Sequence, residues 1–175
     1  NVFVQSQKKL LYLYEVISEL NRYEAPQKKK EADAKLNKLK QDFFNSLAED
    51  FNTPKALSFV YLLAKSALVL SARKTKDDQA LSDLLFIKEN LLSFGQIMGF
   101  LRKEPTEFIE QMKTRILKDL PITEQEIEQL IKERNAAREA KDWAKSDAVR
   151  DQLLEHGIAL QDNANETTWT VQGAV

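Results

Sequence analysis

Cysteine is absent from this 175-residue chain, and histidine occurs once, at His156. The first absence excludes a disulfide framework and any zinc site built on cysteines within the chain. A single histidine also excludes clusters of histidine ligands and histidine-based catalytic triads. Glycine is scarce too, at four residues, and the sequence contains no glycine-rich phosphate loop. We therefore expect the chain itself not to be catalytic.

Charge and hydropathy restrict the partners of the chain. Its net charge is −1 although 30% of its residues are charged, so binding of a nucleic acid would have to come from a local site rather than from bulk charge. No stretch approaches the roughly 20 apolar residues of a membrane span, and residues 1–20 lack the apolar centre of a signal peptide. We expect a cytoplasmic protein with no membrane partner. The chain does not begin with Met, so we also expect it to be a piece of a longer protein.

Hydrophobic residues recur at steps of three and four along the first part of the chain, which predicts amphipathic helices. The expected helices cover about 4–23, a segment from about residue 31, 53–72 and 77–100. The sequence ALSFVYLLAKSALVL of the third is apolar around much of its circumference, so we expect that helix to be buried centrally. Short polar turns join the helices, which predicts an antiparallel bundle. We place this bundle at residues 1–118, with a short helix from about Thr106 to Leu117 at its end.

The pattern changes in the remainder of the chain, residues 119–175. Thr123 and Glu126 form the Thr-x-x-Glu pattern of a capping box, and a hydrophobic stripe follows it. Asp142 has the character of an N-cap for another helix. Gly157 is expected to end that helix, because glycine adopts the left-handed conformation at low cost.

Two short strands are predicted after Gly157, at 158–161 and 168–171, because the sequence there alternates and turns like a hairpin. The predicted fold class is therefore mainly α. It consists of an antiparallel helical bundle followed by a small α+β unit with a short C-terminal hairpin.

A lysine-rich stretch is the first candidate for contact with RNA. Its members are Lys28, Lys29, Lys30, Lys35, Lys38 and Lys40. Such a run is able to contact a phosphate backbone. However, Glu31 and Asp33 interrupt it, and a solvated helix face is the more common reason for the pattern.

The stretch KDWAKSDAVRD, residues 141–151, is the second candidate. At about 3.6 residues per turn, Trp143, Asp147 and Arg150 lie on one side of a helix. Arg138 lies in the preceding helix near the turn. An aromatic ring, a carboxylate and guanidinium groups are the parts needed to stack an unpaired base and hydrogen-bond to its edge. The alternative is a Trp packed on the neighbouring helix beside surface ions, and spacing alone favours that alternative.

The sequence LIKERNAAREAKDWAKSDAVRDQLLEHGIALQDNANETTW closely resembles the C-terminal end of bacterial cysteinyl-tRNA synthetases. That family shows an Arg-x-x-Ala-Arg-x-x-Lys-Asp-(Trp or Phe) run, then a Gly-Ile-x-Leu-x-Asp segment and Gly-Thr-x-Trp. In addition, DFFNSLAEDFNTPKAL resembles the helical-bundle domain of the same family, which has Asp-Phe-Asn-Thr-Pro at the equivalent turn. The resemblance extends over nearly the whole chain in the right order.

The resemblance implies a helical bundle of the DALR type, followed by a small anticodon-binding domain. It also implies that residues matching Arg138, Trp143, Asp147 and Asp162 read the anticodon. Enzymes of this family attach cysteine to its tRNA with ATP, and a zinc ion selects the cysteine thiol. Their catalytic motifs do not occur here, so ATP and zinc would belong to the parent enzyme. The implied partners are the tRNA for cysteine and the catalytic domain of the same parent chain.

One position departs from the family pattern, since Glu166 stands where the family has Gly before Thr-x-Trp. Glycine in such a turn often takes a backbone conformation that Glu resists. This departure and the near-neutral net charge leave a second hypothesis open. In it, the chain is a helical protein-interaction or scaffold module that keeps the fold without specific RNA binding.

Overall fold

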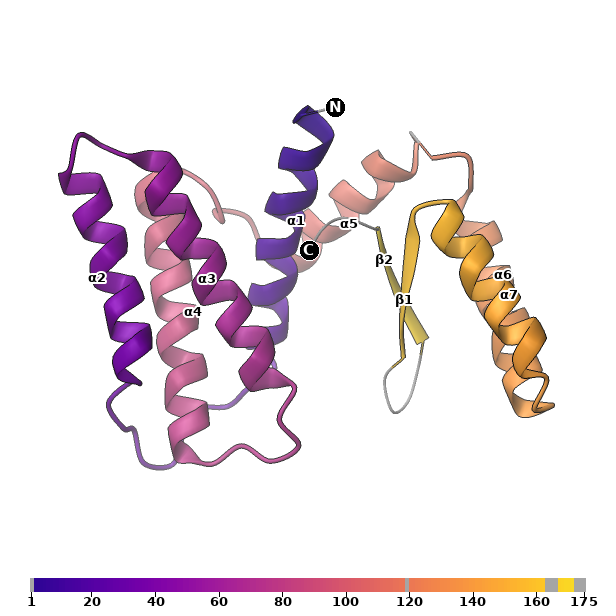
Figure 1. The fold of residues 1–175 in the computed structure, drawn as a ribbon, viewed down its shortest axis with the longest axis horizontal. Coiled ribbons are helices and arrows are strands. Elements are labelled where there is room, and N and C mark those ends of the chain that lie inside the picture. The colour runs from indigo at the N-terminus through magenta and orange to yellow at the C-terminus, as the bar shows by residue number, and fades with distance from the viewer. Residues whose placement is uncertain (1, 119, 163–166, 172–175) are drawn as a thin grey trace. The chain divides into compact units, whose positions relative to one another are not determined.

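The computed structural model describes residues 2–118, 120–162 and 167–171 (Figure 1). These residues form seven helices and one antiparallel two-stranded sheet, as the sequence predicted in kind and in order. The elements are α1 (Val2–Leu20), α2 (Ala34–Ala48), α3 (Thr53–Ser71), α4 (Asp78–Met98), α5 (Pro105–Leu117), α6 (Glu124–Glu139), α7 (Trp143–Glu155), β1 (Ile158–Asp162) and β2 (Thr167–Val171).

The chain divides into two compact units. One is Leu13–Glu107, and the other combines Asn1–Tyr12 with Phe108–Val175. We call them the bundle unit and the hairpin unit. The division falls within α1 and near the start of α5, whereas the sequence placed the domain boundary between residues 118 and 119. Most of α5 is thus grouped with the hairpin unit by its contacts.

Helix α3 packs against both α2 and α4 in the bundle unit. The rings of Phe43 and Phe94 stack with 3.7 Å between their centroids and join α2 to α4. Both rings are fully buried. Stacked aromatic rings contribute more than their buried area alone, so this pair anchors the centre of the bundle.

Helix α2 begins at Ala34, later than the predicted start near Glu31. The preceding segment is held against α4, because Ser82 Oγ accepts from the backbone N–H of Lys30 (2.9 Å) and Asp83 Oδ1 accepts from that of Asp33 (2.9 Å). Asp33 then caps the helix with its own carboxylate, which accepts from the backbone N–H of Lys35 (2.7 Å). Long-range hydrogen bonds therefore set the helix start, and local sequence does not reveal them.

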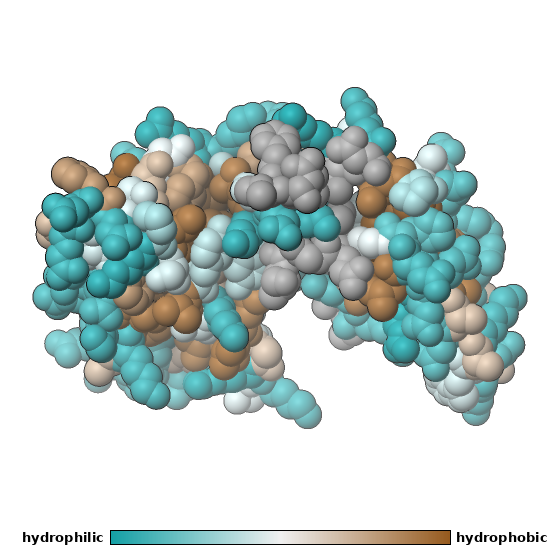
Figure 2. Space-filling model, turned by 45° about the horizontal axis from the view of Figure 1, so that its top comes forward, coloured by the Kyte–Doolittle hydropathy of each residue, from teal (hydrophilic) through white to brown (hydrophobic). Residues whose placement is uncertain are grey.

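Helix α3 is not buried around its circumference, and that prediction was wrong. One face is buried in the bundle, while Leu62, Leu68 and Val69 are 46%, 36% and 61% exposed. Figure 2 shows hydrophobic residues on the bundle surface among hydrophilic ones. By length and composition α3 is also able to cross a membrane, so the expectation that no segment approaches a span was wrong on these measures. The core helix of a water-soluble protein often has the same length and apolar composition.

The core of the hairpin unit lies where α6, α7 and β1 meet. Ile127, Leu153 and Ile158 are each fully buried there. Gly157 has a φ of +80°, in the left-handed region, and connects α7 directly to β1. β1 pairs with β2 in antiparallel register from Ile158↔Val171 to Asp162↔Thr167. This register places Asp162 at the end of β1, directly beside the start of β2.

The capping box at the start of α6 is present as predicted. Thr123 Oγ1 accepts from the backbone N–H of Glu126 (3.3 Å), and Glu126 Oε2 accepts from the backbone N–H of Thr123 (2.7 Å). These two bonds satisfy donors that would otherwise lack partners at the helix start.

We expect Thr123→Ala to lower the free energy of unfolding of the hairpin unit by about 1 kcal/mol, because the first turn of α6 loses its cap. Urea unfolding followed by circular dichroism measures this change. Gln125→Ala, at an exposed position in the same turn, is the control and should change stability by less than about 0.5 kcal/mol. Equal effects of the two variants would contradict the importance of the cap.

Candidate nucleic-acid interface

The turn between α6 and α7 places Trp143 at the surface. Lys141 adopts a left-handed conformation with φ of +60°, and its backbone N–H donates to Arg138 O (3.0 Å), so α6 ends there. Asp142 caps α7, since its Oδ1 accepts from the backbone N–H of Lys145 (3.1 Å). Trp143 is then the first residue of α7, and it is 60% exposed.

The exposure of Trp143 tests the interpretation in which its ring packs on the neighbouring helix. Its buried residues are Ser146, Val149 and Leu153. Trp143, Asp147 and Arg150 are all exposed. The alternative in which Trp143 packs on the neighbouring helix was therefore wrong. An indole that is mostly in water offers an aromatic face to a ligand.

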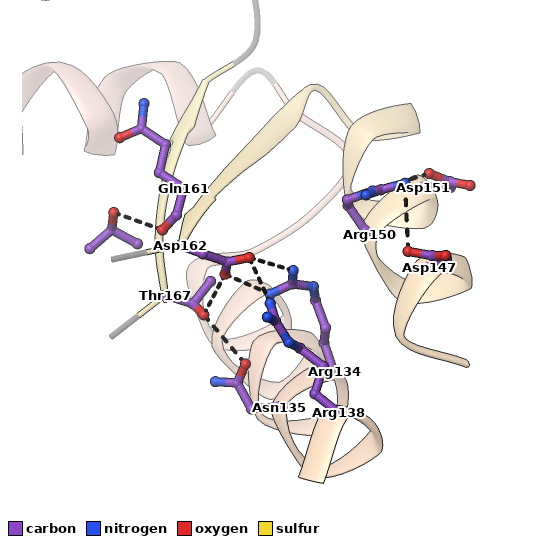
Figure 3. Close-up of polar contacts among 10 residues, drawn as sticks. Arg134, Asn135, Arg138, Asp147, Arg150, Asp151, Gln161, Asp162 and Thr167 are labelled. Carbon is purple, nitrogen blue, oxygen red and sulfur yellow. Dashed lines mark hydrogen bonds and ion pairs between the residues drawn. The ribbon is translucent and has the colours of Figure 1, made fainter. Parts of the chain in front are cut away.

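Asp147 is loosely paired on this exposed side of α7 (Figure 3). Its Oδ1 lies 3.6 Å from Arg150 Nη2, and its side chain is 63% exposed. Arg150 also lies 3.6 Å from Asp151. Both distances exceed that of a good hydrogen bond. The carboxylate of Asp147 thus keeps acceptor sites for another donor.

Asp162 differs from Asp147, because three residues donate hydrogen bonds to its carboxylate (Figure 3). Arg134 binds it in a fork, with Nη1 donating to Oδ1 and Nη2 donating to Oδ2, both at 2.8 Å. Arg138 Nη1 donates to Oδ2 at 2.7 Å. Thr167 Oγ1, from β2, donates to Oδ1 at 2.9 Å. We call Arg134, Arg138, Asp162 and Thr167 the carboxylate cluster.

The carboxylate of Asp162 is ionised at neutral pH. The hydrogen bonds from Arg134 lower the pKa of Asp162 far below its usual range, and those from Thr167 and Arg138 act in the same direction against partial burial. The same bond to Asp162 raises the pKa of Arg134, and the nearby charge of Asp147 adds to this effect.

The structure brings only some of the predicted site residues into contact. Arg138 and Asp162 form a direct ion pair. Trp143 and Asp147 lie on the adjoining helix and make no hydrogen bond or ion pair with the cluster within the described residues.

Arg134 is the residue that the sequence interpretation missed. Its side chain is only 7% exposed, and it occupies the buried side of α6 together with Ile127 and Ala137. A signal was available in the sequence, because Arg134 follows Ile127 by seven residues and so continues the hydrophobic stripe. A charged residue at a buried position requires a partner, and that partner is Asp162.

Two earlier observations have different outcomes. Glu166, the departure from the family pattern, lies outside the described residues. The lysine-rich stretch is exposed: Lys38 pairs with Asp42 (3.1 Å), Lys29 approaches Glu89 (3.8 Å), and the side chains of Lys29 and Lys38 are 68% and 74% exposed. This exposure fits a solvated helix face and phosphate contact alike.

Comparison with known proteins agrees with the sequence motifs. The family model described as "Cysteinyl-tRNA ligase anticodon binding domain" matches residues 120–169. The family model described as "DALR domain" matches residues 42–102. The chain belongs to the cysteinyl-tRNA synthetase family. It corresponds to the C-terminal region of that family and carries its DALR and anticodon-binding domains.

Several relatives named cysteine--tRNA ligase share this region. The chain is 38% identical to that of Geobacter sulfurreducens over 130 residues, which is 74% of this chain and 26% of the relative. It is 38% identical to that of Desulfotalea psychrophila over 144 residues, which is 81% of this chain and 29% of the relative. It is 32% identical to that of Anaeromyxobacter dehalogenans over 172 residues, which is 98% of this chain and 35% of the relative. The chain thus spans between about a quarter and a third of the length of these relatives.

We expect Asp162→Asn to lower the free energy of unfolding of the hairpin unit by about 1–3 kcal/mol at pH 7, because the buried guanidinium of Arg134 loses its counter-charge. The effect is limited because Asp162 is 41% exposed and water screens part of the charge. Chemical unfolding at pH 7 measures it. Asp151→Asn, which removes a loosely paired surface carboxylate, is the control and should cost well under about 1 kcal/mol.

The stabilities of wild type and Asp162→Asn should depend differently on pH. The pKa of Asp162 is lowered in the folded state, relative to about 3.9 in the unfolded chain. Its contribution is therefore present above about pH 4 and is lost as the pH falls below this value towards the folded pKa. The stability difference between wild type and Asp162→Asn should shrink on acidification. A difference that stays constant from pH 7 to pH 2 would contradict the role of the ionised carboxylate.

Proposed function

We propose that this chain binds the anticodon loop of the tRNA for cysteine through Trp143, Asp147, Arg138 and Asp162. The observation that supports this function most directly is the exposed ring of Trp143, at 60%, on the same helix as the exposed carboxylate of Asp147. An exposed indole has an unfavourable contact with water, and a stacked base removes it. Base–aromatic stacking is worth about 1–3 kcal/mol per base.

Asp147 suits the reading of a base edge. Its carboxylate is largely exposed and paired only at 3.6 Å, so it retains lone pairs that a ligand is able to reach. A carboxylate accepts from the amino or imino N–H of a base and repels an edge that presents an acceptor. Single-stranded loops offer such edges once their bases are unstacked.

Arg138 and Asp162 supply a donor and an acceptor on the adjoining helix and strand. The guanidinium of Arg138 is 42% exposed and keeps further N–H groups beyond the one given to Asp162. These groups are able to bind base acceptors or phosphate oxygens. The arrangement therefore combines stacking, acceptance and donation, which are the elements of single-strand RNA recognition.

The longer protein, we propose, is a cytoplasmic enzyme that joins cysteine to this tRNA with ATP. Its catalytic domain would be a second partner of this chain. The described residues include no group of three or more His, Cys, Asp or Glu side chains placed to hold a metal, and the sequence has no cysteine. The zinc ion expected of the family therefore does not fit here, and we assign both zinc and ATP to the remainder of the protein.

A scaffold module is the second candidate function. The exposed hydrophobic residues of the bundle unit favour it, in particular Phe51 at 81%, Val69 at 61% and Ile97 at 52%. Apolar groups of this kind often mark contacts between proteins. Such a module would not discriminate between anticodon sequences, and this difference separates the two candidates.

The first experiment is binding of the chain to a cysteine-tRNA anticodon stem-loop and to the same stem-loop with its three anticodon bases changed. We expect tighter binding to the cognate loop, with an affinity that falls as salt is raised because phosphate contacts contribute. Trp143→Ala should weaken cognate binding by about 1–3 kcal/mol through the loss of stacking. Fluorescence anisotropy at two salt concentrations measures these quantities.

Phe51→Ala is the matched control, since it removes another exposed aromatic ring, from the bundle unit, and should leave RNA binding unchanged. Equal affinity for both loops would reduce the chain to a nonspecific RNA binder. Absence of binding to either loop would support the scaffold function instead.

Asp147→Ala should relax discrimination at one anticodon position by about 1–3 kcal/mol more than it weakens general affinity. The measurement is binding to a series of stem-loops that each differ at one anticodon base. Asp151→Ala removes the neighbouring carboxylate that shares Arg150 and should leave the pattern unchanged. A uniform loss across the series would exclude base readout by Asp147.

A further inference from the structure

Asp162 has no free acceptor site in this structure. An ionised carboxylate offers about four lone-pair positions. Oδ1 accepts from Arg134 and Thr167, and Oδ2 accepts from Arg134 and Arg138, at 2.7 to 2.9 Å. A base N–H is able to bind Asp162 only by taking the place of one of these donors. The question is therefore which donor leaves and which donors stay.

Burial separates the two arginines. The side chain of Arg138 is 42% exposed and gives a single hydrogen bond to Asp162. That of Arg134 is 7% exposed and gives two. Solvent or RNA is able to replace Asp162 as a partner of Arg138, because Arg138 already reaches water. Arg134 lacks that possibility.

Arg134 depends on Asp162 for its compensation. Its Nε is buried and has no hydrogen-bond partner within the described residues. Its two terminal nitrogens donate to Asp162. Separating the pair would leave the buried guanidinium of Arg134 without a counter-charge, which is strongly unfavourable. Arg134 and Asp162 therefore stay together when other partners of Asp162 exchange.

We propose that Arg134, supported by Thr167, is a positioning residue that holds the carboxylate of Asp162 in place while RNA takes the position that Arg138 occupies in this structure. The inference rests on the proposed anticodon function. Arg134 lies on α6 and Thr167 on β2, so Asp162 on β1 is fixed from both neighbouring elements. Arg134 itself is buried and does not touch the RNA.

The fork geometry of Arg134 is the property to test. Arg134→Lys keeps the positive charge but is unable to bind both oxygens in one plane. We expect this variant to lose roughly tenfold in the ratio of affinities for the cognate and the base-changed stem-loop, the size of one well-oriented base contact. Affinity for the base-changed loop should not change. Lys132→Met, which removes a positive charge from an exposed position of the same helix, should leave the ratio intact.

A double-mutant cycle shows whether Arg134 acts through Asp162. Asp162→Asn should lower the discrimination ratio by itself, and adding Arg134→Lys should then cause no further loss. A purely structural role would lower the affinity for both loops together. Full discrimination in Arg134→Lys, or an equal further loss in the Asp162→Asn background, would overturn the inference.

Thr167→Val keeps the test valid where Arg134→Lys is unfolded at the temperature of the binding assay. It removes a donor to Oδ1 and retains a β-branched residue suited to a strand. We expect a smaller loss, of several-fold, in the same ratio. An unchanged ratio in this folded variant would overturn the inference. A wild-type chain that does not discriminate between the loops would instead remove the proposed function itself, and the inference with it.

Discussion

The ion pair between Arg134 and Asp162 fixes the hairpin unit around its site. It joins the buried side of α6 to the end of β1, 28 residues later in the sequence, by two bonds of 2.8 Å. A buried ion pair is often no more stable than a hydrophobic pair of the same size, yet each partner requires the other. The pair forms in the observed strand register, in which Asp162 at the end of β1 reaches α6.

Local signals in the sequence predicted most elements closely. The capping box at Thr123, the cap at Asp142 and the left-handed Gly157 depend on neighbouring residues only, and each is observed. Errors arose where distant contacts override local preference. Helix α2 starts late because α4 side chains bind the preceding backbone. The sequence of α3 shows that the helix has much apolar surface. It does not show which part of that surface the other helices cover.

The candidate site was predictable only in part, for similar reasons. Helical spacing places Trp143 and Asp147 on one side of α7, but it does not say whether another element covers that side. Resemblance to a family drew attention to Arg138 and Asp162 through their local motifs. Arg134 was overlooked, although it continues the spacing of the buried residues of α6. Its role depends on its partner Asp162 in β1. The spacing of residues along a helix does not predict which residue of a strand it contacts.

The two carboxylates of the proposed site differ in how far the protein organises them in the absence of a ligand. Asp147 is loosely paired and exposed, so a ligand that binds it has few protein bonds to break, but few protein bonds fix its side chain beforehand and fixing it has an entropic cost. Asp162 is already held by four hydrogen bonds, so its orientation is set in advance, but one bond must be exchanged. A preset acceptor discriminates more strictly, because a base placed wrongly is not able to draw the carboxylate towards itself. A site that combines both therefore gains adaptability from α7 and strict geometry from the pair between α6 and β1.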